Sequence, residues 1–181
     1  MKRLALALSF GLFAALPAVA QGTDPQNTVY LQTKDGRITI RLRPDLAPKH
    51  VEQIKTLTKR GFYDGIVFHR VIPGFMAQTG DPTGTGTGGS DLPNIPAEFG
   101  QEPFKRGSVG MARSSSPNSA NSQFFICYEG CAPLTGQYTL FGEVVSGMDV
   151  VDKIKKGSSA NNGAVSNPDK IVKMQLAADA K

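Results

Sequence analysis

The sequence predicts a mainly β protein with two helices, either a closed antiparallel barrel or a β-sandwich. Short stretches in which apolar and polar residues alternate recur along the chain. Turn signals rich in glycine, proline and asparagine separate these stretches, and only two segments have helical periodicity. No internal repeat and no linker divides the chain, so a single domain is expected over residues 28–181.

The first twenty residues are expected to lie outside this domain. A basic start at residues 2–3 precedes an apolar run at residues 4–16, and a small-x-small cleavage signal occupies residues 18–20. This order is typical of a secretory signal peptide, and the apolar run is too short to span a bilayer as a helix. The sequence therefore predicts an exported protein, periplasmic or secreted, with a flexible leader at residues 21–27.

The first part of the domain is predicted to be a hairpin followed by a helix. Ile38, Ile40 and Leu42 alternate with polar residues after a turn signal at residues 34–36, which indicates a β-hairpin with one buried face. An amphipathic helix is expected from residue 48 to residue 60, because apolar residues recur at spacing three and basic residues fill its last turn.

The rest of the domain is predicted to add strands and a second helix, the helix over residues 147–157. Alternation within one strand places Phe124 and Ile126 on one face and Phe125 on the other. Phe125 should therefore be exposed or line a pocket. The strand-like segments are residues 66–78 with a break at Pro73-Gly74, and residues 108–113, 123–128, 138–145 and 170–177.

Composition argues against several classes of function. Without the first twenty residues the chain has 18 basic and 15 acidic residues, and the basic ones are scattered, so no nucleic-acid partner is expected. No further long apolar run suggests membrane insertion. The segment Gly84–Gly89 matches GxGxxG, but Pro93 and Pro96 prevent the helix that a dinucleotide site needs. This segment is interpreted as a flexible surface loop.

Few residues have the chemistry of nucleophiles or metal ligands. The only histidines are His50, expected to face solvent, and His69, expected to be buried and hydrogen-bonded. A metal site and a Ser-His-Asp triad are therefore poorly supported, a hydrolase is disfavoured and no cofactor is expected. Cys127 and Cys131 could form a disulfide in an oxidising compartment or act as small apolar side chains, and both alternatives stay open.

The segment from Phe68 to Gln78 sets one arginine, Arg70, among apolar and amide side chains, which suits polarising an amide better than cleaving it. Extended to Asp81, it resembles the signature of the cyclophilin-type peptidyl-prolyl cis-trans isomerases. Segments 107–113, 122–126 and 134–144 resemble the next blocks of that family, in the same order. The resemblance covers residues 28–176, essentially the whole domain.

The resemblance implies a closed eight-stranded antiparallel barrel capped by two helices, with the binding groove on its outer wall. Arg70 would be the catalytic residue. Gln78 and Gln123 would hydrogen-bond the substrate backbone, and Ala112 and Arg113 would form the floor, Arg113 through its main chain. The proline pocket would consist of Phe75, Met76, Phe125, Leu134 and Tyr138.

The implied activity is faster rotation about X-Pro bonds in exported, folding proteins, by a monomer without metal, cofactor or covalent intermediate. Two alternatives of other classes are a binding module that only grips prolyl segments and, less favoured, a hydrolase. The chain departs from many eukaryotic members at Pro133, where they have tryptophan, and in a loop at 114–121 that is one residue longer. The departure at Pro133 bears on cyclosporin sensitivity, which the sequence leaves open, and the longer loop leaves the alignment of residues 114–121 open.

Overall fold

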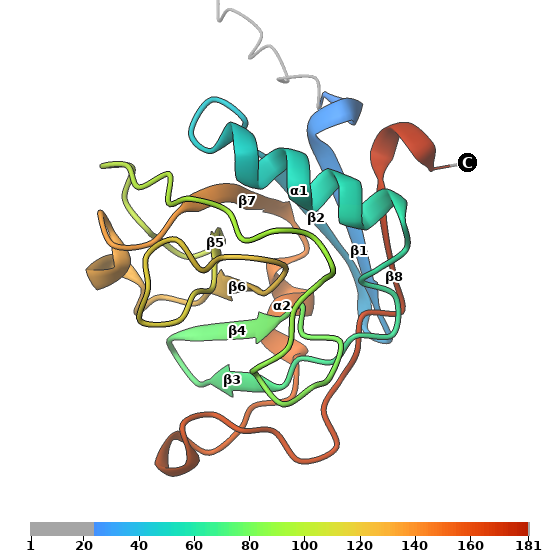
Figure 1. The fold of residues 1–181 in the computed structure, drawn as a ribbon. Helices are drawn as coiled ribbons and strands as arrows, with labels where there is room; N and C mark the ends of the chain where they lie inside the picture. Colours follow the sequence, from blue (N-terminus) through green and yellow to red (C-terminus); the bar gives the residue numbers. More distant parts are fainter. Residues whose placement is uncertain (1–23, 181) are drawn as a thin grey trace, which may run out of the picture.

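The computed structural model describes residues 24–180, so the predicted signal peptide lies outside the described residues (Figure 1). None of the helices in this part of the chain is long and apolar enough to cross a membrane. The α-helices are α1 (Pro48–Lys59) and α2 (Met148–Lys153), and the 3-10 helices are η1 (Pro25–Asn27), η2 (Ala132–Leu134), η3 (Ser159–Asn161) and η4 (Ala177–Asp179). The strands are β1 (Thr28–Thr33), β2 (Gly36–Leu42), β3 (Arg70–Ile72), β4 (Met76–Thr79), β5 (Ser108–Met111), β6 (Phe124–Cys127), β7 (Leu140–Ser146) and β8 (Lys173–Leu176).

These eight strands form one antiparallel sheet in the order β3-β4-β6-β5-β7-β2-β1-β8. Figure 1 shows that the sheet is strongly curled, but its two edge strands, β3 and β8, do not pair with each other. Isolated bridges near that seam join Val67 to Lys170 and Arg70 to Ala164, and neither of them pairs β3 with β8. The mainly β fold with two helices is confirmed. The closed barrel is wrong, because the sheet is an open, curled half-barrel.

A covering segment explains why the sheet stays open. Residues 157–165, the 157–165 loop, lie along β3 and take its edge hydrogen bonds. Val71 donates its N–H to Gly163 O at 2.8 Å and accepts a hydrogen bond from Gly157 N at 2.9 Å. The backbone groups that a closing strand would need are therefore already paired, which also protects this edge from other chains.

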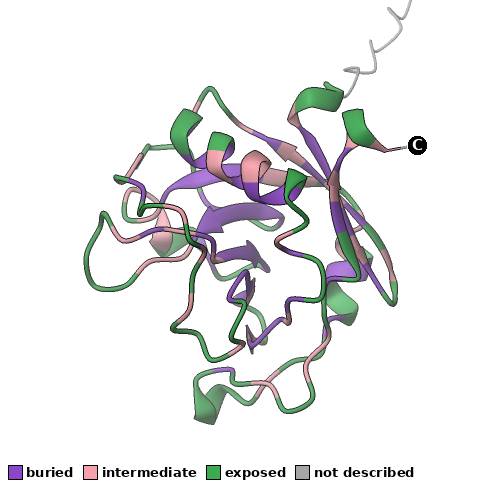
Figure 2. Cartoon of the chain, turned by 45° about the vertical axis from the view of Figure 1, so that its right-hand side comes forward, coloured by how far each residue is buried: buried purple, intermediate pink, exposed green. Residues whose placement is uncertain are grey.

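The inner face of the curled sheet carries the main hydrophobic core. The register places Val71, Ala77, Ile126 and Val109 side by side across β3, β4, β6 and β5, and all four are fully buried. In β2 the predicted buried residues Ile38, Ile40 and Leu42 are at most 2% exposed, which confirms the hairpin. The helices α1 and α2 pack against this core with their buried sides and expose the others (Figure 2).

Helix α1 is capped by a residue from a distant loop. Its N-cap residue, Ala47, makes no side-chain hydrogen bond. Glu98 instead accepts hydrogen bonds from the backbone N–H groups of Lys49 and His50, and it lies 2.6 Å from His50 Nδ1. His50 is fully buried, so the expectation that it faces solvent is wrong. Burial lowers the pKa of His50, which favours the neutral ring.

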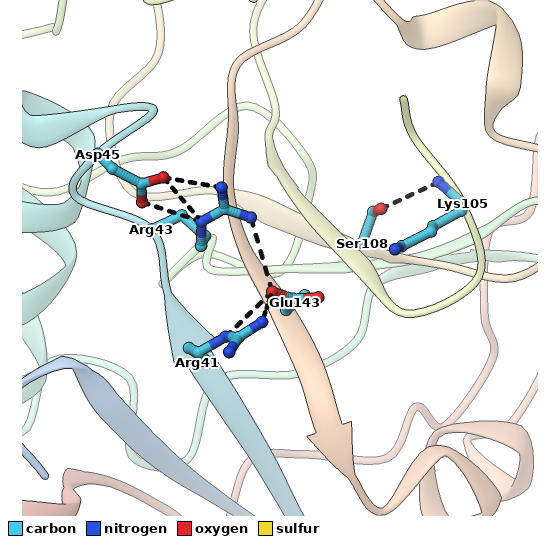
Figure 3. Close-up of polar contacts among 6 residues, drawn as sticks. All are labelled: Arg41, Arg43, Asp45, Lys105, Ser108 and Glu143. Atoms are coloured by element: carbon cyan, nitrogen blue, oxygen red, sulfur yellow. Dashed lines mark hydrogen bonds and ion pairs between the residues drawn. The ribbon is translucent and has the colours of Figure 1, made fainter. Parts of the chain in front are cut away.

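The outer face of β2 and β7 carries a cluster of paired charges, shown in Figure 3. Arg41 and Glu143 are cross-strand partners, and Arg41 Nε donates to Glu143 Oε1 at 3.0 Å. Arg43 Nη1 lies 3.7 Å from the same oxygen, and Arg43 also holds Asp45 at 2.7 Å. The hydrogen bond that Arg43 donates to Asp45 raises the pKa of Arg43. These arginines are thus neutralised by carboxylates.

Candidate active site

The candidate site is built on the outer face of the opposite end of the sheet. Cross-strand register aligns Arg70 of β3 with Gln78 of β4, Gln78 with Phe125 of β6, and Phe125 with Gly110 of β5. Because side chains alternate along a strand, this row projects away from the inner core. Phe124 and Ile126 belong to the inner core, whereas Phe125 belongs to a smaller outer cluster, so the predicted division of these three residues is confirmed.

Arg70 is half-buried and is held only by neutral groups. Its Nε donates to the backbone O of Asn162 at 3.0 Å, its Nη2 to Asn162 Oδ1 at 2.9 Å, and its Nη1 to Gln78 Oε1 at 3.0 Å. A guanidinium has five N–H donors, so one on each Nη finds no acceptor among residues 24–180. Burial lowers the pKa of Arg70, Tyr138 opposes this shift only in part, and no carboxylate among residues 24–180 pairs with the guanidinium.

A chain of amides continues from Arg70. Arginine can only donate, so Gln78 must turn its oxygen toward Arg70 and its nitrogen toward Gln123 Oε1, at 2.9 Å. Gln123 in turn donates its two N–H groups to the backbone oxygens of Gly86 and Gly88, at 3.1 and 2.8 Å. The orientation of both amides is therefore fixed by the arginine. One N–H of Gln78 has no acceptor in the described chain.

A cavity of about 440 Å³ opens beside Arg70. It brings together every predicted site residue except Gln123, which lines a neighbouring cavity of about 600 Å³. The sequence did not identify several of its lining residues: the threonines and glycine at 85–87, His69, and residues 161, 162 and 164. The predicted residues that line the cavity are Arg70, Phe75, Met76, Gln78, Ala112, Arg113, Phe125, Leu134 and Tyr138.

The apolar wall of this cavity is tightly packed. The Phe125 ring stacks on Phe104 and meets Tyr138 edge to face, both with ring centroids 5.8 Å apart. Gly110, behind it, has no room for a side chain, because a Cβ there would lie 2.5 Å from the Phe125 ring. Phe125 is 4% exposed and Met76 is 1% exposed. The wall is therefore formed before any ligand binds.

A covalent link supports the far side of the cavity. Cys127 at the end of β6 and Cys131 form a disulfide, which resolves the alternative that the sequence left open. Both cysteines are fully buried. The helix η2, which carries Leu134, begins at the next residue, and Tyr138 donates its N–H to Leu134 O. The disulfide thus ties this part of the cavity wall to the sheet.

Arg113 lies between two rings at the cavity rim. Its guanidinium carbon is 4.6 Å from the centroid of Tyr138 and 5.8 Å from that of Phe99. Its N–H groups donate to the backbone oxygens of Gln137 and Ser114. Arg113 was expected to act through its main chain, and its side chain also lines both cavities.

The glycine-threonine loop is held in place by a buried carboxylate. Asp81 accepts hydrogen bonds from Thr83 N and Oγ1, both at 2.8 Å, and from Gly86 N at 2.5 Å. Burial alone raises the pKa of Asp81, but these bonds and one from Gly88 lower it to about 2. The loop lies at the surface, as the sequence predicted, but these bonds hold it in one arrangement, and residues 85–87 form a wall of the cavity.

His69 is buried, as predicted, but the hydrogen-bonded partner expected for it is missing. Neither ring nitrogen has a partner within the described part of the chain. Burial lowers the pKa of His69, which favours the neutral form of its ring. Among the described residues, no group of three or more histidine, cysteine, aspartate or glutamate side chains could hold a metal ion.

Comparison with known proteins agrees with this geometry. The family model for the cyclophilin type peptidyl-prolyl cis-trans isomerases matches residues 28–176. A probable peptidyl-prolyl cis-trans isomerase of Brucella suis biovar 1 is 58% identical over 192 aligned residues, which cover 99% of this chain and 98% of the relative. A peptidyl-prolyl cis-trans isomerase of Helicobacter pylori strain J99 is 44% identical over 131 residues, which cover 70% of this chain and 80% of the relative.

Solved structures show the same fold. A cyclophilin from Hirschia baltica superposes with a TM-score of 0.78 at 28% identity and covers 88% of this chain and 77% of its own. A cyclophilin type isomerase from Cryptosporidium parvum, crystallised in the presence of the dipeptide Ala-Pro, gives a TM-score of 0.75 at 30% identity. That match covers 82% of this chain and 98% of the other. The chain belongs to the family of cyclophilin-type peptidyl-prolyl cis-trans isomerases.

Proposed function

We propose that Arg70 is the catalytic residue of this isomerase and that its substrates are proline-containing segments of exported, folding proteins. One observation carries the assignment. Arg70 keeps two donors and an uncompensated charge at the edge of an apolar cavity large enough for a proline ring and its flanking peptide. Arg43, by contrast, is paired with the carboxylate of Asp45.

The barrier that the enzyme must lower comes from amide resonance. The C–N bond of an X-Pro peptide has partial double-bond character, with a rotation barrier of about 18–20 kcal/mol, and uncatalysed exchange takes tens to hundreds of seconds. When the bond is twisted, resonance is lost and the proline nitrogen gains a lone pair. A donor fixed near that nitrogen stabilises the twisted state more than either planar state, which is the requirement for catalysis.

The remaining residues are assigned by where they lie. Phe75, Met76, Phe125, Leu134 and Tyr138 hold the proline ring against the apolar wall. The unused N–H of Gln78 donates to a substrate carbonyl, while Gln123 keeps Gln78 oriented. Ala112 and Arg113 form the floor where the flanking peptide lies. The crystal of the Cryptosporidium relative with Ala-Pro supports a proline-containing substrate.

Two substitutions of Arg70 test this role. Arg70→Ala should lower kcat/KM for a short prolyl peptide by on the order of a hundredfold, equivalent to about 2.7 kcal/mol, with the unfolding free energy nearly unchanged. Arg70→Lys keeps a charge but loses the planar fork, so it should recover only part of that loss. Isomerisation is measured by protease-coupled cleavage or by NMR exchange. Full activity of Arg70→Ala would refute the assignment.

The alternative class, a module that binds prolyl segments without catalysis, is separated by the same assay. Peptide binding measured by calorimetry with no gain in the isomerisation rate would favour the binding module. The fixed guanidinium favours the enzyme, because a binding module gains nothing from a donor held for the twisted state.

Export and a monomeric state are further parts of the proposal. The signal-like order of residues 1–20 and the buried disulfide support export, since disulfides persist in oxidising compartments. Expression of the full chain in a bacterium with a periplasm should yield a periplasmic product whose mass is that of the chain beginning at Gln21. A product that stays in the cytoplasm with Met1 in place would contradict export. Light scattering of that product should give the mass of one chain.

A further inference from the structure

Asn162 holds the guanidinium of Arg70 from the side opposite Gln78. Of the three hydrogen bonds that Arg70 donates to the described chain, two go to this residue, one to its backbone oxygen and one to Oδ1. The two residues are 92 positions apart in the sequence. Neither the family signature around Arg70 nor the local sequence at residues 158–163 indicates this contact.

The backbone of Asn162 is shaped for this contact. It follows the 3-10 helix η3 and adopts φ 49° and ψ 30°, the left-handed region. Among residues other than glycine, asparagine enters this region most readily, because its short side chain tolerates it. Only one other non-glycine residue in residues 24–180, Asn167, has a positive φ, at 51°. This conformation lets Asn162 present Oδ1 and its backbone oxygen to the same guanidinium.

The loop that carries Asn162 is itself fixed to β3. Gly163 directly follows it and accepts the N–H of Val71, and a Cβ on Gly163 would lie 2.5 Å from Ile72 Cγ1. Gly157, before Asn162, donates its N–H to Val71 O, and Val165, after it, donates its N–H to His69 O, so bonds to β3 and its flank lie on both sides of Asn162. The strand that carries Arg70 therefore also holds the residue that orients it.

The chemistry of the contact matters as much as its geometry. Asn162 and Gln78 are neutral amides, so they fix the plane of the guanidinium without neutralising its charge. A carboxylate at either position would fix the plane equally well but would form an ion pair. The two N–H groups left over, one on each Nη, remain fully charged donors.

We propose that Asn162 is a positioning residue for the isomerase reaction, which locks the guanidinium of Arg70 in the plane that directs its two unused N–H groups into the cavity. The inference rests on the proposed catalytic role of Arg70. It predicts that loss of Oδ1 affects catalysis only through Arg70, and that it leaves substrate binding and folding nearly unchanged.

Asn162→Gly is the sharpest variant, because glycine adopts the same φ without strain and keeps the backbone oxygen. We expect kcat for a prolyl peptide to fall about tenfold, with KM and the midpoint of thermal unfolding nearly unchanged. Asn167→Gly is the matched control: it changes the other left-handed asparagine, which is exposed and makes no contact with Arg70, and it should keep full activity.

A double-mutant cycle gives the decisive test. If Asn162 acts through Arg70, adding Asn162→Gly to Arg70→Ala should cause no further loss of kcat. Multiplicative losses in the double variant, or full activity of Asn162→Gly alone, would overturn the inference. Full activity of Arg70→Ala would instead overturn the proposed catalytic role, so the two failures are distinguishable.

Discussion

Two groups of arginines lie on the outer face of the same curled sheet, and they differ in what holds them. Arg41 and Arg43, on and beside β2, are bound by the carboxylates of Glu143 and Asp45. Arg70 on β3 is bound by two amide side chains and a backbone oxygen. In the first arrangement the arginine charges are neutralised by carboxylates, and the pair of Arg41 with Glu143 joins β2 to β7. The second fixes the side chain and leaves its charge without a carboxylate partner, as the proposed catalytic role requires.

The two groups of arginines also differ in their exposure to water. Beside Arg70 the outer face is apolar, formed by Phe125, Met76 and their neighbours. Arg41 is 41% exposed at its side chain, so water screens it. A charge next to an apolar wall interacts more strongly with a developing lone pair than one in water does. Four experiments test this contrast.

The largest effect is expected from removing the apolar wall. Phe125→Ala leaves a cavity between Phe104 and Tyr138 and should lower the unfolding free energy by about 3–5 kcal/mol, in addition to lowering kcat/KM. Denaturant unfolding and the isomerase assay measure the two effects. Phe75→Ala is the control, because Phe75 is only half-buried and should affect activity with a smaller cost in stability. If Phe75→Ala lowered the unfolding free energy as much as Phe125→Ala does, the wall around Phe125 would not be packed before a ligand binds.

A slightly smaller effect is expected from the carboxylate that fixes the neighbouring loop. The pKa of Asp81 is about 2 in the folded protein, below its value in the unfolded chain, so its stabilisation is present above about pH 4 and is lost as the pH falls toward 2. This difference between the folded and unfolded pKa values of Asp81 corresponds to about 2 kcal/mol of unfolding free energy. Asp81→Asn should therefore be less stable than wild type by that amount at pH 7.

The difference in unfolding free energy between wild type and Asp81→Asn should disappear near pH 2. Denaturant unfolding at a series of pH values from 7 to 2 measures it. If that difference stayed the same from pH 7 to pH 2, the charge of Asp81 would not be what holds the loop. Glu98 titrates in the same direction, since the hydrogen bonds from His50 and Lys49 outweigh its burial and lower its pKa. Comparing wild type with Asp81→Asn cancels that contribution.

Converting the unpaired arginine into a paired one is expected to have an intermediate effect. Gln78→Glu places a carboxylate against Arg70 and should lower kcat/KM about tenfold, or about 1.4 kcal/mol, because the charge is then neutralised. Gln78→Met breaks the amide chain without adding charge and serves as the comparison. A loss for Gln78→Met as large as that for Gln78→Glu would mean that orientation, and not charge, is what Arg70 needs.

The smallest effect is expected at the paired cluster. Glu143→Gln leaves Arg41 and Arg43 without a shared carboxylate, and it should lower the unfolding free energy by about 1 kcal/mol or less. Salt screens such pairs, and in 1 M NaCl the Debye length is only about 3 Å. The difference in unfolding free energy between wild type and Glu143→Gln should therefore shrink at that salt concentration. Isomerase activity should not change. A loss of activity would show that the two arginine groups are coupled.

The alternation of single strands could be predicted from the sequence, and contacts between distant segments could not. The positions of Phe124, Phe125 and Ile126 follow from a period of two, which local sequence shows. The burial of His50 depends on Glu98, which is 48 positions away, and no local pattern records that pairing. For the same reason the sequence missed the 157–165 loop, which keeps the sheet open and brings Asn162 to Arg70.

The disulfide between Cys127 and Cys131 has a consequence for how the protein responds to proteolysis. The residues between the two cysteines include Glu129 and Gly130, which are exposed in a turn and open to a protease. A cut at that turn would leave both ends covalently joined, with the pocket-bearing segments still attached to one another. Clipped molecules would therefore run as one species until a reductant separates them.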